Sequence, residues 1–110
     1  MSCMPLDGGD FNVATNVLDG QVVLQLAGEL DSLTAPRLRM ALDDLRNRRV
    51  STLVFDLAKL TFIDSSGFHE LVVALKRQRE VGGEVVLRGP SPWTRRVLEI
   101  VGLSQILTIE

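Results

Sequence analysis

The sequence is short of the residues that build disulfides, zinc sites and membrane spans. Its 110 residues include one cysteine and one histidine. Cys3 has no partner for an internal disulfide, which agrees with a reducing compartment. One Cys and one His, far apart in sequence, cannot make a structural zinc site, and we expect no metal or other cofactor. No apolar run approaches the roughly 18 residues that cross a bilayer.

The N-terminus also lacks targeting features. The segment Met1-Ser2-Cys3-Met4-Pro5 has neither the basic region nor the apolar region of a secretory signal. We therefore expect a cytoplasmic protein with no membrane insertion. Apolar residues make up 45% of the chain and charged residues 24%, which is ordinary for one globular domain with a single core.

Charge of one sign is not in excess either. The chain has 12 Lys and Arg residues and 14 Asp and Glu residues, which give a net charge of −2 at pH 7. This balance argues against a nucleic-acid partner. Two arginine clusters, at Arg46, Arg48 and Arg49 and at Arg77 and Arg79, are interpreted as solvated helix faces.

Catalytic signatures are absent. Ser66 and His69 are three residues apart and would share a helix surface. A hydrolase, however, also needs an orienting carboxylate and an oxyanion hole, and the Gly-x-Ser-x-Gly pattern does not occur. His69 is simply a partly exposed residue of a first helical turn in this interpretation. Asp31, Asp56 and Asp64 could approach one another at strand ends, but their spacing does not fit a calcium loop. We expect no enzyme.

Residues 1–9 are expected to be a disordered tail, and residues 10–110 a single domain. Within this domain, the first strands are predicted to form a hairpin. The alternation from Phe11 onward predicts a half-buried strand. Asp19-Gly20 is a strong hairpin signal, and residues 21–27 alternate again. Gly28-Glu29-Leu30-Asp31 is expected to end that second strand.

A helix follows the hairpin. Ser32 or Thr34 can cap it, and Pro36 falls in its first turn, where its missing N–H costs nothing. Leu38, Leu42 and Leu45 give it one apolar stripe. The basic residues 46–49 are expected at its C-terminal end. Residues 52–56 then predict a third strand, without polar alternation, as in a central strand.

The second half continues in the same alternation of elements. A helix is predicted from about Ser66 to Val81, stopped by Gly82-Gly83, and a strand over residues 84–88. Pro90-Ser91-Pro92 opens a third helix that ends at Gly102, and residues 106–109 make a last short strand. The order β-β-α-β-α-β-α-β predicts an α/β domain. Its mixed sheet has about five strands, mainly parallel after the hairpin, with about three helices.

The segment Asp64-Ser65-Ser66-Gly67, called the serine motif below, is the most informative part of the sequence. It lies where a strand hands over to a helix, near N–H groups and a helix dipole that favour negative charge. A serine there can be an N-cap, or it can accept a phosphate. Two successive serines need not both cap, so one hydroxyl is left over for modification.

Three segments carry a family resemblance: Gly28-Glu29-Leu30-Asp31, the serine motif, and Gly82-Gly83-Glu84-Val85-Val86 with Ser91-Pro92 downstream. With this element order, the sequence from about Phe11 to Ile109 resembles a bacterial anti-sigma factor antagonist of the STAS-domain family. The resemblance implies a STAS-like fold and a partner-switching function. Such a protein binds an anti-sigma factor that is also a serine kinase, and so releases a sigma factor.

The resemblance also assigns roles to individual residues. It implies that the kinase phosphorylates Ser66 and that a serine phosphatase removes the phosphate. Asp31 and Asp64 would lie in the surface that meets the kinase, with Ser65 and Gly67 flanking the phosphoacceptor. The ATP belongs to the partner, and the free protein is expected to be a monomer.

One departure and one alternative remain open at this stage. Many relatives carry a small or aliphatic pair after the motif's glycine, whereas this chain has Phe68-His69. If His69 faces the partner, it could change which kinase is accepted. The alternative is a STAS module that serves as a constitutive subunit of a transporter or signalling assembly, where Ser66 caps the helix and is not phosphorylated.

Overall fold

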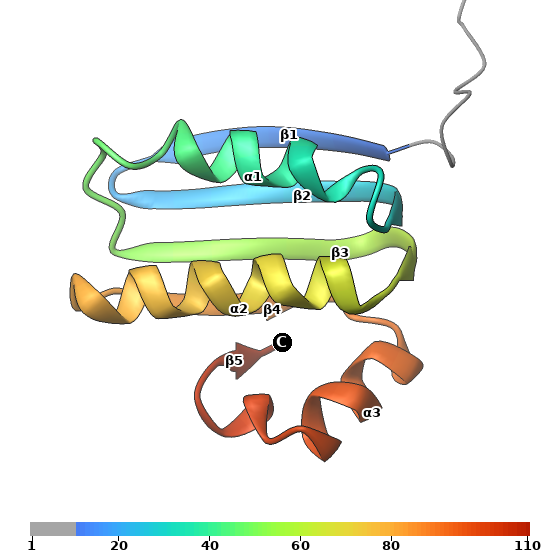
Figure 1. Cartoon of the computed structure of the whole chain (residues 1–110). Helices are drawn as coiled ribbons and strands as arrows, with labels where there is room; N and C mark the ends of the chain where they lie inside the picture. The colour runs from blue at the N-terminus through green and yellow to red at the C-terminus, as the bar shows by residue number, and fades with distance from the viewer. Residues whose placement is uncertain (1–10) are drawn as a thin grey trace, which may run out of the picture.

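A five-stranded mixed sheet organises the chain. The computed structural model describes residues 11–110, so the expected tail lies outside the described residues. The strands follow one another across the sheet in sequence order. They are β1 (Phe11–Leu18), β2 (Gln21–Leu30), β3 (Thr52–Ile63), β4 (Glu84–Arg88) and β5 (Thr108–Ile109). Only β1 and β2 are antiparallel; every later neighbour is parallel (Figure 1). The predicted class and element order are confirmed.

The hairpin turn is as tight as the sequence predicts. Leu18 pairs with Gln21, so Asp19 and Gly20 form a two-residue loop. Both have positive φ, 50° and 82°. A turn with positive φ at both central residues matches the right-handed twist of its two strands, and Asp-Gly tolerates that conformation.

Three helices accompany the sheet, and two of them lie side by side over one of its faces (Figure 1). Their bounds are α1 (Ala35–Asp43), α2 (Ser65–Glu80) and α3 (Pro92–Ile100), with a 3₁₀ turn η1 (Leu103–Gln105) before β5. Beneath α1 and α2, apolar side chains of the strands and helices form one core. Its fully buried members include Leu24, Leu30, Leu38, Phe55 and Leu87.

Strand β3 is much longer than the predicted 52–56. It runs on to Ile63 because β2, which ends at Leu30 within the predicted segment 28–31, continues to pair with it. The register shifts twice along this pairing, and each shift inserts an extra residue into β3. Such bulges break the regular alternation of buried and exposed side chains. The single-sequence pattern therefore misses the second half of the strand.

Helix α1 is shorter than predicted. It ends at Asp43, and the chain continues in 3₁₀-type turns in which Leu45 and Arg46 donate to the carbonyls of Leu42 and Asp43. Leu45 stays buried, but the basic residues 46–49 lie beyond the helix, so the expectation that they form its C-terminal end is wrong. They are exposed at the surface, as expected. The last strand is also shorter than predicted, because a 3₁₀ turn precedes it.

The predicted stop of α2 is confirmed. Gly82 has a φ of 77°, and its N–H donates to the carbonyl of Arg79, while the N–H of Gly83 donates to that of Gln78. This is the paired bonding of a Schellman cap, which favours glycine at the left-handed position.

The other end of α2 is pressed against the sheet at Gly67. A Cβ on this residue would lie 2.7 Å from Ile63 Cγ1 and 2.7 Å from Leu30 Cγ, at the ends of β3 and β2. Carbon atoms at that distance overlap, so glycine is required for the helix to begin this close to the strands. This contact fixes the position of the serine motif.

A substitution at Gly67 tests that contact. We expect Gly67→Ala to lower the free energy of unfolding by about 1–3 kcal/mol, because overpacking outweighs the gain in helix propensity. Urea denaturation measures the change. Ser65→Ala, at the exposed start of the same helix, is the control and should shift stability by less than about 0.5 kcal/mol. Equal stability of Gly67→Ala and wild type would mean that the strand ends yield to the methyl group.

Candidate functional site

Two acidic residues meet at the carboxyl edge of the sheet. Leu30 pairs with Ile63 at the ends of the parallel strands β2 and β3. Asp31 directly follows β2, and Asp64 directly follows β3. The N–H of Asp64 donates to the carbonyl of Leu30 at 3.1 Å, which ties the two segments together. Asp56 does not join them, because it lies midway along β3, opposite Gln25 and Arg88.

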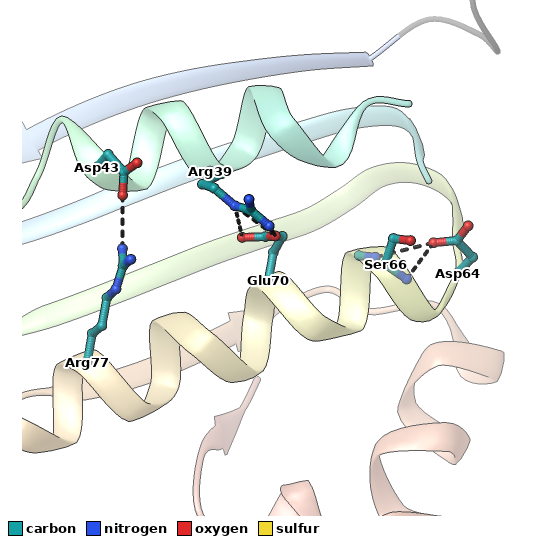
Figure 2. A network of polar contacts seen from close by, with 7 residues as sticks. Arg39, Asp43, Asp64, Ser66, Glu70 and Arg77 are labelled. Atoms are coloured by element: carbon teal, nitrogen blue, oxygen red, sulfur yellow. Dashed lines mark hydrogen bonds and ion pairs between the residues drawn. The ribbon is translucent and has the colours of Figure 1, made fainter. Parts of the chain in front are cut away.

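Asp64, and not a serine, caps α2. Its backbone is extended, and its Oδ1 accepts the N–H of Ser66 at 2.9 Å and the N–H of Gly67 at 3.2 Å (Figure 2). The N-cap role that the sequence left open for a serine is therefore taken by Asp64. The physical reason is the length of β3: the strand reaches Ile63, so Asp64 is the last residue before the helix and the serines are already helical.

The capping carboxylate leaves both serine side chains without a structural task. Ser65 is exposed and Ser66 is half-buried. Neither hydroxyl forms a hydrogen bond with any residue in 11–110. A hydroxyl that holds nothing in place can react or bind without cost to the fold.

Asp31 is held by its own loop. Its Oδ1 accepts the N–H groups of Leu33 and Thr34, both at 3.0 Å. Thr34 precedes α1, but its hydroxyl does not cap the helix; it turns back to the N–H of Asp31 and the carbonyl of Glu29. The expected side-chain cap by Ser32 or Thr34 is thus not formed. The half-buried carboxylate of Asp31 is instead fixed beside the serine motif.

Of the remaining predicted residues, one lies on the surface and one is buried beneath it. His69 is exposed, whereas Gly67 is buried and acts from beneath by letting the helix approach the strands. Ser66 and His69 are not hydrogen-bonded to each other within the described chain. Phe68, half-buried between them and the core, contacts Trp93 with ring centroids 6.4 Å apart.

Large apolar side chains surround this edge of the sheet. Leu33, Phe62 and Trp93, called the apolar rim below, are 56%, 51% and 61% exposed. Phe62 and Trp93 also line a pocket of about 230 Å³ between the end of β3 and the start of α3. The sequence does not predict Phe62 at this edge, because the predicted strand ends at residue 56. The bulges in β3 disrupt the alternation that would have indicated its full length.

An ion pair between α1 and α2 lies one turn further along. Arg39 donates to Glu70 through Nε at 3.2 Å and through NH2 at 2.5 Å, with Glu70 almost fully buried (Figure 2). The hydrogen bond to Glu70 and the negative charge of Glu70 raise the pKa of Arg39. A second, more exposed pair joins Arg77 to Asp43 at 3.1 Å. No local pattern predicts contacts between residues so distant in sequence.

Within residues 11–110, no group of three or more His, Cys, Asp or Glu side chains could hold a metal ion. No helix in the described part of the chain is long and apolar enough to cross a membrane.

The fold and the site together define a small α/β domain that presents a serine hydroxyl and two carboxylates at one edge of a mixed sheet. The family model of the STAS domain matches residues 12–110. The chain therefore belongs to the STAS-domain family.

Several relatives of the chain are named anti-sigma factor antagonists. The anti-sigma-B factor antagonist of Listeria monocytogenes is 38% identical over 85 residues, which cover 77% of this chain and 75% of the relative. The crystal structure of an anti-sigma factor antagonist from Mycobacterium paratuberculosis is 30% identical with a TM-score of 0.77, covering 97% and 89% of the two chains. The Bacillus cell fate determinant SpoIIAA, in its phosphorylated form, is 27% identical with a TM-score of 0.75, covering 92% and 91%. The resemblance found in the sequence is confirmed.

The cap assignment makes a prediction that separates Asp64 from Ser66. We expect Asp64→Ala to lower the free energy of unfolding by about 1 kcal/mol, because two N–H groups lose their acceptor. Ser66→Ala should change it by less than about 0.5 kcal/mol, because its hydroxyl forms no hydrogen bond. Thermal and urea denaturation measure both changes. Asp64→Asn is the control, since Asn caps as well as Asp; a larger loss for Ser66→Ala than for Asp64→Ala would contradict the assignment.

Proposed function

We propose that this protein is an anti-sigma factor antagonist that binds a kinase-type anti-sigma factor, thereby releases a sigma factor, and is switched off by phosphorylation of Ser66. The observation that carries the proposal is the hydroxyl of Ser66, which stands unbonded at a strand–helix junction while Asp64 caps the helix. The names of the relatives support the antagonist role. The solved phosphorylated form of SpoIIAA supports a phosphate-regulated state.

The chemistry required of this chain is that of a substrate. The Oγ of Ser66 attacks the γ-phosphorus of the ATP that the kinase holds. A new bond between Oγ and phosphorus forms, the bond to the β–γ bridging oxygen breaks, and ADP leaves. The hydroxyl proton passes to a base of the kinase. The chain supplies a positioned nucleophile and no catalytic group of its own, so we propose that it is not an enzyme.

The kinase-binding surface in this proposal combines charge with apolar area. Ser66 is surrounded by Asp31, Asp64, Ser65 and His69. Gly67 allows the start of α2, which carries these serines, to pack closely against the strand ends. The apolar rim borders the same edge. Aromatic side chains that become buried often carry a large share of the binding free energy in protein interfaces, while neighbouring charges favour the correct partner.

Phosphorylation would block this surface without unfolding the domain. A phosphate adds about −1.5 to −2 charge. In a docked complex that charge would be desolvated beside the like charges of Asp31 and Asp64. A loss of a few kcal/mol in binding weakens a complex by roughly a hundredfold or more. The fold itself loses nothing, because the hydroxyl holds no other group in place.

The remaining parts of the proposal concern partners and location. A serine phosphatase would restore the binding form by hydrolysing the phosphate, and the free protein would be a monomer in the cytoplasm. ATP would be bound by the kinase. Nucleic acid is not a proposed partner, given the net charge of −2.

The phosphosite is tested first by mass. The protein is incubated with ATP and a kinase-type anti-sigma factor encoded next to its own gene. We expect one added phosphate, which peptide mapping assigns to Ser66. Ser66→Ala should accept none, while Ser65→Ala is the matched control and should still be modified. Phosphate on Ser65 would move the site by one residue. No phosphate with any kinase of this class, alongside stable complexes with transport or scaffold proteins, would favour the constitutive module instead.

Binding is tested with the same variants. We expect Ser66→Ala to bind the kinase as tightly as wild type, and the phosphorylated protein to bind roughly a hundredfold more weakly. Ser66→Asp should fall between them, because one carboxylate carries less charge than a phosphate. Titration calorimetry measures the affinities, and circular dichroism checks that helix content is unchanged. Loss of helix content on phosphorylation would overturn a switch that acts at the surface alone.

A further inference from the structure

The ion pair between Arg39 and Glu70 lies beside the proposed phosphosite. Ser66 and Glu70 are four residues apart on α2, so their side chains occupy the same helix face, with Cβ atoms about 6 Å apart. Arg39 reaches Glu70 from α1 with both Nε and NH2 (Figure 2). A phosphate on Ser66 would therefore arrive one helical turn from a buried carboxylate and the guanidinium that neutralises it.

The first turn of α2 offers the phosphate little of its own. The N–H groups of Ser66 and Gly67 already donate to Asp64 Oδ1, and that of Phe68 donates to the Asp64 carbonyl. A phosphate would also meet the negative charges of Asp64 and Glu70. Like charges four residues apart on a helix are unfavourable. The modified side chain therefore needs a cation from outside α2.

Arg39 is placed to supply that cation. Among the described residues, it is the basic side chain with an ion pair to the first two turns of α2. Its side chain is 56% exposed, so the guanidinium can move, whereas Glu70 is 3% exposed and held. Both helices begin at the same edge of the sheet, and helical side chains lean toward the N-terminus of their helix. Leaning further in that direction carries Arg39 toward Ser66.

We propose that Arg39 is the phosphate-binding residue of the modified protein: its guanidinium binds the phosphate on Ser66 while it remains paired with Glu70. This inference rests on the proposed function, since it concerns the phosphorylated form. Arginine suits the task because its planar fork donates to two acceptors at once. Modification of α2 thereby changes the surface of α1 as well, and enlarges the region that a kinase or phosphatase can distinguish.

The decisive experiment compares two variants that differ only in Arg39. Glu70→Gln retains Arg39, whereas Arg39→Gln with Glu70→Gln lacks it, and neither leaves a buried carboxylate without a partner. Phosphoserine is placed at position 66 during translation, so the test does not depend on any kinase. Phosphorus NMR then follows the titration of the phosphate. We expect the double variant to titrate at higher pH, because loss of the guanidinium raises the pKa of the phosphate.

Other charged groups near the phosphate are the same in both variants. Asp31, Asp64 and His69 are retained, so their effects cancel in the comparison. Arg77→Gln is the matched control: it breaks the pair with Asp43, but lies about 16 Å further along α2, and should leave the titration unchanged. Identical titrations of the Glu70→Gln protein and the double variant would overturn the proposal and mean that the phosphate faces solvent.

A measurement on the unsubstituted chain guards against unfolding of the variants. Nitrogen NMR of the Arg39 Nε should show a shift when Ser66 carries phosphate, while Arg77 Nε should not. No shift at Arg39 would overturn the proposal. In another outcome, the phosphoserine placed at position 66 shifts Arg39 Nε although no kinase modifies Ser66. That result would support phosphate binding by Arg39 and would contradict the proposed phosphorylation switch.

Discussion

The close contact between Gly67 and the ends of β2 and β3 is the constraint on which the rest of the site depends. With 2.7 Å between an added Cβ and the side chains of Ile63 and Leu30, only glycine lets α2 begin against the sheet. The helix must then start within one residue of the strand. Asp64 is left as the single residue at the junction, where its carboxylate accepts two N–H groups. Packing thus determines the cap, and the cap determines which hydroxyls remain available.

The site separates the groups that hold the fold from those that can interact. One oxygen of Asp31 accepts backbone N–H groups of the loop before α1, and one oxygen of Asp64 accepts N–H groups of the first turn of α2. The hydroxyls of Ser65 and Ser66 do not contribute such bonds. A charge added to Ser66 therefore acts on the surface without removing a fold-stabilising contact. This arrangement suits a protein whose partners, rather than its stability, are to change with modification.

Buried charge links the neighbouring helix to the same region. Glu70 is nearly inaccessible to solvent, and an ionised carboxylate in that position requires a partner. Arg39 is that partner, and it brings α1 into electrostatic contact with the first turns of α2. The apolar rim completes the edge with exposed side chains from the loop before α1, from β3 and from α3. Three stretches that are separate in sequence, from residues 31–39, 62–70 and the start of α3, thus contribute to one surface.

Local chemistry by itself determined the element order, the Asp19-Gly20 turn, the stop at Gly82 and the place of the serine motif between a strand and a helix. These features follow from periodicity and from the backbone preferences of Gly, Pro and Asp, which act over a few residues. Only the tertiary structure decided the length of β3, the cap at Asp64, the rim at Phe62 and the pairing of Arg39 with Glu70. Bulged strand pairing and helix contacts join residues far apart in the chain, and no local pattern encodes which of them will meet.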